Sequence, residues 1–392
     1  MPGTQIPQGS TSEKQTRHQL ALVFFVLIIV AVLVTAAHAQ TYTVLHSFAG
    51  APYDGLLPEA GVIMDASGNL WGTTEGGGAQ NFGTIFRLAP DGTMKSYSFR
   101  GTPDGRYPES GLLLYKGSLY GTTTEGGDYN FGTVFKLDRI NHLTVLHSFT
   151  GGDDGATPSA GLVRDAAGNM YGTAGGAGAN GVGVIFKLDV NGIFSVVYAF
   201  TGGTDGSYPN STMALDTAGN LYGTTTKGGT SHCALSGCGT VFRLNPAGNE
   251  TVLYRFLGKS DGAVPLGVIK VANNLYGTTL SGSGTIFELT PGRGLATLYN
   301  FTDPREGTNP EANVSAGNHS LYGTTVTGGA NDFFGTVFQL DANGMKTLHS
   351  FNGSDGRVAY APLLVDAAGN IYGTTSFGGD YDLGVVFKIT PQ

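Results

Sequence analysis

The sequence has little of what several common classes of protein need. Only 13 % of its 392 residues are charged, and the net charge of −8 leaves no basic surface for nucleic acid. Glycine is abundant instead, at 64 residues, but without the G-X-Y period of collagen. Each glycine destabilises a helix interior by roughly 1 kcal/mol, so long helices are unfavourable. Because aromatic residues make up 10 % of the chain, disorder is also disfavoured, and an all-β protein rich in turns remains.

Motifs of the common enzyme classes are missing too. The chain has no G-x-S-x-G, H-E-x-x-H, P-loop or EF-hand spacing. Its many Gly-Gly pairs have no helix after them, so they do not read as phosphate cradles. We therefore expect no cofactor and no metal. Catalysis by a pair of carboxylates stays open, because their separation is invisible in a sequence.

Residues 1–39 have the pattern of a targeting segment. A polar stretch carrying Lys14 and Arg17 precedes an apolar run over residues 20–37, and Ala37-His38-Ala39 matches a signal-peptidase site. The run is also long enough to span a bilayer, so the alternative is an uncleaved N-terminal anchor. Either way we expect residues 40–392 to be exported, as a secreted, periplasmic or cell-surface protein, with membrane contact only through the N-terminal segment.

Residues 40–392 consist of one unit repeated seven times. Each unit contains an apolar residue followed by an aromatic residue, glycine and threonine. The aromatic residues of this motif are Trp71, Tyr120, Tyr171, Tyr222, Tyr276, Tyr322 and Tyr372. A period near 50 residues is typical of β-propeller blades.

Each unit predicts four short strands, and the two ends of the repeat region complement each other. Residues 42–48 are a copy of the fourth strand, whereas residues 384–389, at the other end, are a copy of the third. Joining them completes the seventh unit and leaves no open sheet edge. The sequence therefore predicts a single domain, 40–392, that is a seven-bladed β-propeller closed by its N-terminal strand.

The stretches Pro58–Trp71 and Pro158–Tyr171 resemble the core of NHL-type propeller repeats and the propellers of two-component regulators. The fuller unit, with Tyr-Gly-Thr-Thr, Gly-Thr-Val-Phe-Lys-Leu and Leu-His-Ser-Phe, more closely resembles the choice-of-anchor GloVer tandem-repeat family of exported bacterial proteins. The resemblance covers residues 42–390 and implies export and cell-surface attachment, but no activity. The sequence stops directly after a strand, so we expect no C-terminal anchor of the kind that names the family.

In such a propeller the loops from fourth to first strand and from second to third strand share one face. These are the long loops, and long loops on β scaffolds commonly carry function. Their departures from the repeat are acidic or aromatic and fall in units six, seven, one and two, which adjoin in a closed ring. The candidate binding residues are Glu59, Glu75, Glu109, Glu125, Asp128, Tyr129, Asp380, Tyr381 and Asp382, with Glu311 in unit six. They predict either a sugar-binding or cation-assisted site, or merely a solvated acidic rim.

Two repeated positions invite a metal hypothesis that we disfavour. A loop carboxylate recurs in every unit, and seven near-identical copies suit the capping of a turn better than a single site; the positions are Asp54, Asp104, Asp154, Asp205, Asp261, Glu306 and Asp355. His46, His147 and His349 share a fourth-strand position with Tyr in the other units, which favours ring packing over metal ligation.

Cys233 and Cys238 are the only cysteines and lie in one long loop. In an exported protein such a pair predicts a disulfide.

For function, the sequence favours a non-catalytic, monomeric binding or surface-scaffold module whose partner is a protein or a glycan. The alternative is a polysaccharide-active enzyme, a lyase or glycosidase, that uses carboxylates among Glu59, Glu75, Glu109 and Glu125.

Overall fold

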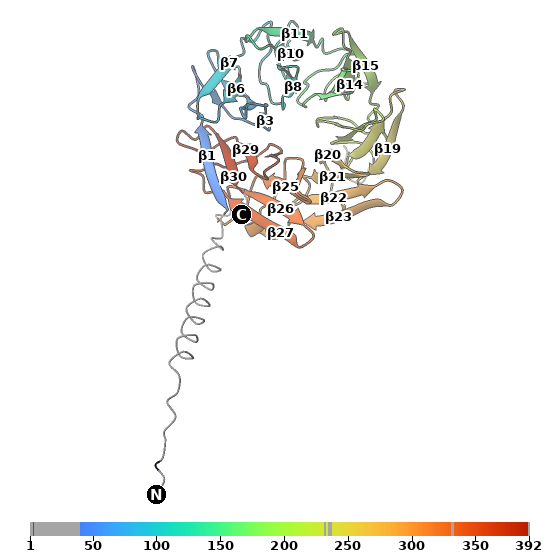
Figure 1. The fold of residues 1–392 in the computed structure, drawn as a ribbon. Helices are drawn as coiled ribbons and strands as arrows, with labels where there is room; N and C mark the ends of the chain where they lie inside the picture. The colour runs from blue at the N-terminus through green and yellow to red at the C-terminus, as the bar shows by residue number, and fades with distance from the viewer. Residues whose placement is uncertain (1–2, 4–39, 231–232, 234–236, 331–332, 391–392) are drawn as a thin grey trace. The chain divides into compact units, whose positions relative to one another are not determined.

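The computed structural model describes residues 3, 40–230, 233, 237–330 and 333–390. Seven antiparallel four-stranded sheets lie around a central channel in the unit Tyr42–Thr390 (Figure 1). This arrangement is a seven-bladed β-propeller, so the predicted fold is confirmed. The expected division at residue 39 and the signal or anchor segment fall on residues 1–39, which are outside the described residues apart from residue 3.

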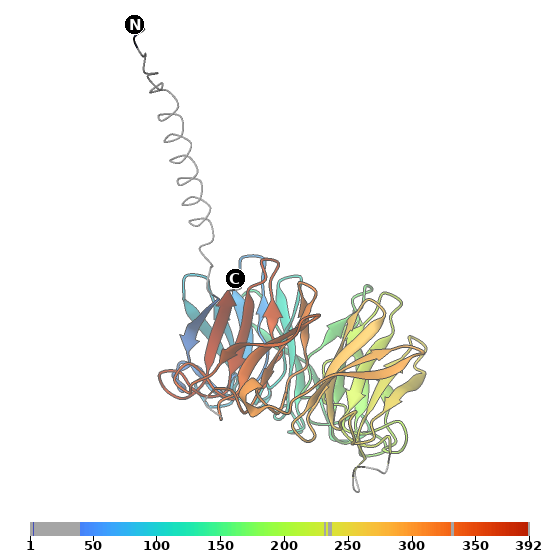
Figure 2. The same ribbon diagram turned by 90° about the horizontal axis from the view of Figure 1, so that it is seen from below.

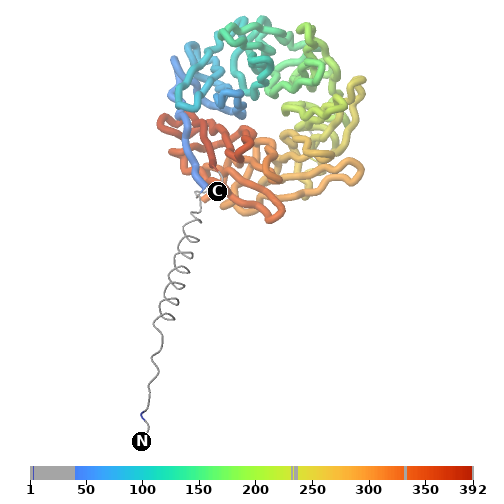
Figure 3. The backbone as a smooth tube through the Cα atoms, viewed as in Figure 1, coloured from blue at the N-terminus to red at the C-terminus, as the bar shows by residue number. Residues whose placement is uncertain are grey.

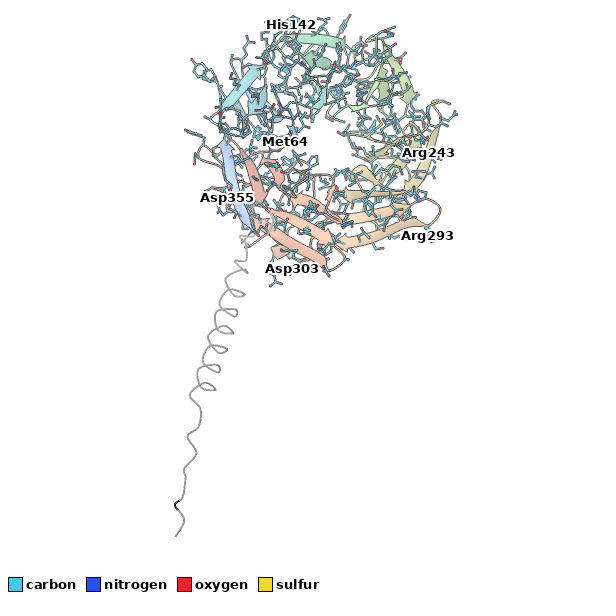
Figure 4. All side chains as sticks on the ribbon, in the orientation of Figure 1. Met64, His142, Arg243, Arg293, Asp303 and Asp355 are labelled. Atoms are coloured by element: carbon cyan, nitrogen blue, oxygen red, sulfur yellow. A yellow bond between two sulfur atoms is a disulfide. The ribbon has the colours of Figure 1, made fainter. Side chains whose placement is uncertain are left out.

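In blades 1–6 the strands run outward in chain order, and in blade 7 the N-terminal strand of the repeat region is outermost. The innermost strands are β3 (Ile63–Met64), β8 (Leu113–Tyr115), β12 (Val163–Arg164), β16 (Ala214–Leu215), β20 (Pro265–Val271), β24 (Ser315–Gly317) and β28 (Leu364–Val365). The second strands are β4 (Leu70–Thr74), β9 (Ser118–Thr123), β13 (Met170–Ala174), β17 (Leu221–Thr225), β21 (Asn274–Thr279), β25 (Ser320–Thr325) and β29 (Ile371–Thr375). Figure 4 shows this inner-to-outer order. Met64 of the innermost strand β3 lies toward the centre of the ring, whereas Arg293, between the third and fourth strands of blade 5, lies at its outer edge.

The third strands are β6 (Thr84–Leu88), β10 (Thr133–Leu137), β14 (Val184–Leu188), β18 (Thr240–Leu244), β22 (Thr285–Thr290), β26 (Thr336–Asp341) and β30 (Val385–Thr390). The fourth strands are β7 (Met94–Ser98), β11 (Leu143–Ser148), β15 (Phe194–Ala199), β19 (Glu250–Arg255), β23 (Gly294–Asn300), β27 (Gly344–Ser350) and, for blade 7, β1 (Thr41–Ser47). The loops add a two-stranded ribbon of β2 (Gly55–Leu56) with β5 (Gly76–Gly77), and the 3₁₀ turn η2 (Pro304–Glu306).

The ring closes as the two ends of the repeat region predict. The sheet of blade 7 has the order β1-β30-β29-β28, and the N–H of Phe48 donates to the carbonyl of Gly384 at 3.0 Å. In Figure 3 the blue and red ends of the repeat region lie side by side. Across the next boundary, the Thr374 hydroxyl donates to the carbonyl of Ala60 in blade 1 at 3.0 Å. The same threonine-to-carbonyl bond joins other neighbouring blades, as between Thr73 and Ser110 at 3.0 Å.

Phenylalanine pairs connect every blade to the next. The phenylalanine that follows each fourth strand contacts the third-strand phenylalanine of the following blade, with ring centroids 5.2–5.6 Å apart and the rings steeply inclined. The pairs are Phe48–Phe86, Phe99–Phe135, Phe149–Phe186, Phe200–Phe242, Phe256–Phe287, Phe301–Phe338 and Phe351–Phe387. All fourteen rings are buried. The core is therefore a belt of aromatic contacts that crosses all seven blade boundaries.

These rings also explain the glycine in the second-strand motif. Gly121 lies directly opposite Phe135 in the sheet, and a Cβ at this position would lie 2.7 Å from the phenylalanine Cζ. The equivalent glycine of each blade faces its own third-strand phenylalanine in the same way. In every blade the second-strand glycine therefore leaves room for the aromatic ring.

We expect Gly121→Ala to destabilise the protein by roughly 1–3 kcal/mol, because the new methyl group overpacks Phe135. Gly111→Ala in the same blade is the matched control, since a Cβ there meets no atom within 4 Å. Thermal unfolding followed by circular dichroism checks the prediction. Equal melting temperatures for the two variants would contradict it.

Candidate functional site

The two faces of the propeller differ in their connections. Turns between first and second strands and between third and fourth strands lie on one face, which we call the turn face; the long loops lie on the other, the loop face. In Figure 2 the loops gather along the lower edge of the ring. The predicted long-loop face is therefore present.

The central channel opens at the loop face through a ring of one residue from each blade. Each residue stands just before the innermost strand, except in blade 5, where it is the second residue of that strand. The ring consists of Glu59, Glu109, Ser159, Asn210, Leu266, Glu311 and Tyr360. Together with the first strands they line a cavity of about 550 Å³. We call this ring the channel mouth. Its three glutamates and its tyrosine come from blades 6, 7, 1 and 2, which adjoin.

The carboxyl groups of the channel mouth influence one another. Burial, together with the charges of Glu75, Glu109 and Glu311, raises the pKa of Glu59 to about 7. Burial, together with the charge of Glu75, raises the pKa of Glu109 to about 6, although Thr124 donates a hydrogen bond of 3.3 Å to its Oε1. Burial also raises the pKa of Glu75 and Glu311. Near neutral pH this cluster can both donate and accept hydrogen bonds.

Tyr360 completes the cluster, and the sequence reasoning missed it. Burial raises its pKa, and the charges of Glu311 and Glu59 on either side raise it further. Its place was readable from the repeat, because Tyr360 occupies in blade 7 the position that Glu59 occupies in blade 1. The displacement of the blade 7 proline to Pro362 hid the match.

Two of the predicted carboxylates take part in ion pairs away from the mouth. Glu125 pairs with Arg106 at 2.6 Å, and Asp382 pairs with Arg357 at 2.8 Å. Asp382 also accepts the N–H of Gly378 at 2.9 Å. These contacts hold the long loops of blades 2 and 7 in place.

The other predicted residues are exposed on the rims of the long loops. Asp128 and Asp380 are exposed, and the side chains of Tyr129 and Tyr381 are 58 % and 61 % exposed. Two further aromatic side chains extend this rim, Tyr53 before blade 1 and Phe333 in blade 6, at 89 % and 75 % exposed. These four side chains lie on blades 6, 7, 1 and 2, which also carry the glutamates of the channel mouth, whereas Tyr208, 36 % exposed, lies on the loop before blade 4.

The repeated loop carboxylates and the repeated His or Tyr positions are bonded to one another. In six blades the histidine ring nitrogen or the tyrosine hydroxyl of the fourth strand is hydrogen-bonded to the loop carboxylate at 2.9–3.1 Å. In the remaining blade the Tyr299 hydroxyl donates to Glu306. The carboxylates also cap their loops, as where Asp205 accepts the N–H of Thr201 at 2.8 Å. The turn-capping interpretation is therefore confirmed. Histidine and tyrosine alternate here because both present a ring donor.

The histidine rings pack as expected. His147 stacks on Phe194 of the next blade with centroids 3.6 Å apart, and His349 stacks on Tyr42 at 3.7 Å. Within the part of the chain that the structure describes, no three His, Cys, Asp or Glu residues are grouped as a metal site would require. A disulfide joins Cys233 to Cys238, as predicted.

Comparison with known proteins gives the family. The family model described as the Gloeobacter/Verrucomicrobia repeat matches residues 31–235 and 230–392. The chain belongs to this repeat family. The resemblance drawn from its motifs is thereby confirmed. No curated protein matches the chain by sequence.

Solved structures share the fold of this repeat protein at low sequence identity. A catalytically inactive variant of virginiamycin B lyase from Staphylococcus aureus, solved with quinupristin, is 15 % identical, with a TM-score of 0.61 over 90 % of this chain and 99 % of that one. A luciferin-regenerating enzyme is 10 % identical, with a TM-score of 0.48 over 90 % of this chain and 95 % of that one. At these identities the likeness is one of fold alone.

The disulfide is compatible with an extracellular location. Over the described ranges we find no helix with the length and hydropathy needed to cross a membrane.

The raised pKa of Glu59 makes the folded chain less stable as the pH rises. Its pKa in the folded chain, about 7, exceeds the ordinary 4.5, so folding favours the protonated carboxyl group. The contribution of Glu59 to the stability of the fold is therefore full below pH 4.5 and is lost as the pH rises through 7. We expect Glu59→Gln to raise the Tm by roughly 1–3 °C at pH 8 and to leave it unchanged at pH 4.5.

Asp91→Asn is the control of opposite sign. The Thr93 N–H holds the pKa of Asp91 below its usual range, so this variant should lower the Tm slightly at both pH values. Scanning calorimetry at pH 4.5 and 8 measures both. A Glu59→Gln variant with the wild-type pH profile would refute the coupling.

Proposed function

We propose that the chain is an exported binding module that takes a neutral or cationic glycan at the channel mouth. The observation that carries this proposal is the group of three glutamates, Glu59, Glu109 and Glu311, that lies beside Tyr360 on one side of the channel mouth. Their pKa values are raised, and the charge of Glu75 contributes to the shifts of Glu59 and Glu109. Perturbed carboxyl groups in a cavity mark functional sites more often than plain surfaces.

Sugar hydroxyls suit this mouth because a partly protonated carboxyl cluster both donates and accepts hydrogen bonds. An ammonium group suits it as well, since it would relieve the repulsion among Glu59, Glu75 and Glu109. The exposed rim of Tyr53, Tyr129, Phe333 and Tyr381 adds aromatic surface on the same blades. Aromatic side chains are common on binding surfaces because they offer a large contact area and lose little conformational entropy when a ligand binds.

Export supports a glycan partner, because polysaccharides and glycoconjugates are what such a protein meets outside the cell. The signal pattern over residues 1–39 and the disulfide are consistent with that location. On the far side of the ring, Ser159, Asn210 and Leu266 carry no charge. We therefore place the ligand over blades 6, 7, 1 and 2 rather than over the whole mouth.

A glycan array with neutral and amino-sugar oligosaccharides, followed by calorimetry on the best ligand, tests the proposal. We expect the double variant Glu59→Gln, Glu109→Gln to weaken binding by roughly tenfold or more, the loss of about two hydrogen bonds to charged groups. Ser159→Ala, at the same ring position in blade 3, is the matched control and should bind within twofold of wild type.

Binding that is equal in the double variant and in the control would refute the site. An array on which neither neutral nor amino sugars bind would refute the ligand class.

One observation favours a second candidate function, a polysaccharide lyase or glycosidase. A carboxyl group with a pKa of about 7 beside other carboxyl groups is what a general acid requires. Mass spectrometry of the oligosaccharides after incubation distinguishes the two functions. Shortened products that disappear in Glu59→Gln, with binding retained, would establish the enzyme, and intact ligand would establish the binding module.

A further inference from the structure

A second cavity lies on the turn face, between blades 1 and 2. It has a volume of about 680 Å³, inside the ~300–1,000 Å³ range of small-ligand sites. Its walls come from the turn between the first and second strands of blade 1 (65–69), from β6 and β7, and from the turn between the third and fourth strands of blade 2 (138–141). Since the glutamates of the channel mouth lie on the loop face, this cavity, which we call the interblade groove, is a separate site.

Blade 1 places two cations directly opposite each other in this groove. The register of the sheet pairs Trp71 of β4 with Arg87 of β6, and Arg87 with Lys95 of β7. Like charges at directly opposed positions destabilise a sheet.

The other blades avoid such a pair. At the positions of Arg87 and Lys95 they have Lys136 with Thr144, Lys187 with Ser195, Arg243 with Thr251, Glu288 with Ala296, and Gln339 with Lys346. In blade 7 the third-strand residue is Lys388. Trp71 also stands alone, because every other blade has tyrosine at its position. The departure from the repeat is thus concentrated in one place.

A third cation reaches the groove from blade 2. Arg139 lines the cavity and donates to the carbonyl of Lys116 at 3.0 Å, lying across Gly117, where a side chain would leave it no room. Arg87, Lys95 and Arg139 therefore converge on one cavity from two blades. This concentration of positive charge is unexpected in a chain with a net charge of −8.

The carboxylates of the groove are already engaged. Asp65 accepts bonds from the N–H of Ser67, the N–H and side chain of Asn69, and the indole of Trp71, at 2.8–3.0 Å. Asp138 accepts the N–H groups of residues 140 and 142, at 2.9 Å each. Both carboxylates cap the turns that form the walls and keep their charge, so the three cations of the lining exceed its two carboxylates by one.

The cations, by contrast, have donors to spare. Arg87 donates one bond, to Asn69 Oδ1 at 2.8 Å, and Lys95 has no hydrogen-bond or ion-pair partner among the described residues. A guanidinium carries five N–H donors in a planar fork that matches a carboxylate. The groove therefore has the charge and the free donors for an anion.

We propose that the interblade groove binds a carboxylated sugar, such as a uronate residue of an acidic polysaccharide. Arg87, Lys95 and Arg139 would take the carboxylate. Trp71, Tyr97 and Leu114 supply the apolar wall that a sugar ring needs, and Asn141 supplies polar groups for its hydroxyls. A small inorganic anion would use the charge but not these walls, and it would leave most of the cavity unfilled.

Calorimetry of the full-length protein with trigalacturonate, at low and at physiological salt, tests the proposal. We expect Lys95→Gln and Arg139→Gln each to weaken binding by roughly five- to tenfold and to reduce its salt dependence. Lys95→Arg should retain binding. Lys346→Gln is the matched control, since it removes the equivalent fourth-strand lysine of blade 6, and it should bind as wild type does.

Two further probes separate sugar recognition from charge alone. A neutral galactose trisaccharide should not bind, and inorganic sulfate should bind at least tenfold more weakly than trigalacturonate. Equal binding of sulfate would overturn the sugar assignment, and equal loss in Lys346→Gln would overturn the location. Glu59→Gln, Glu109→Gln should leave trigalacturonate binding intact, so failure here and failure of the proposed function are distinguishable.

Discussion

The contact between a phenylalanine of one blade and a phenylalanine of the next is the interaction on which the ring depends. It occurs at all seven boundaries, with both rings fully buried. Each edge-to-face pair contributes about 0.5–1.5 kcal/mol beyond the burial of its area. Since the belt is continuous, loss of the closing pair Phe48–Phe86 would expose aromatic surface on two blades at once. Closure by β1 is therefore a requirement of the core as well as of the sheet edges.

Much of this architecture could be predicted because the repeat presents the same physical demand seven times. The period, the strand runs and the spare fourth strand of residues 42–48 led to the closed ring. What they could not give was the partner of each conserved position. The glycine of the second strand is present because of Phe135 and its equivalents, and the His or Tyr of the fourth strand because of a loop carboxylate six to eight residues later. Such pairings depend on contacts that single positions do not reveal.

The candidate site was only partly predictable for the same reason. Glu59, Glu109 and Glu311 were recognised as departures from the repeat, and the fold brings them to one mouth. Glu125 looked equivalent to Glu75, but the strand register places it one residue further along its loop, where Arg106 pairs with it. A shift of one residue reverses the direction of a side chain in extended backbone, so similar motifs put these two carboxylates in different surroundings. Tyr360 was hidden by a displaced proline.

The two faces of blades 1 and 2 therefore differ in charge as well as in loop length. Acidic groups gather at the channel mouth on the loop face, and cations outnumber carboxylates in the groove between the blades on the turn face. In a strictly symmetric ring each feature would recur seven times and both would spread evenly. Because the core contacts are the same at every boundary, substitutions at these surface positions change charge without disturbing the aromatic belt. The scaffold can thus carry two sites of opposite preference on the same pair of blades.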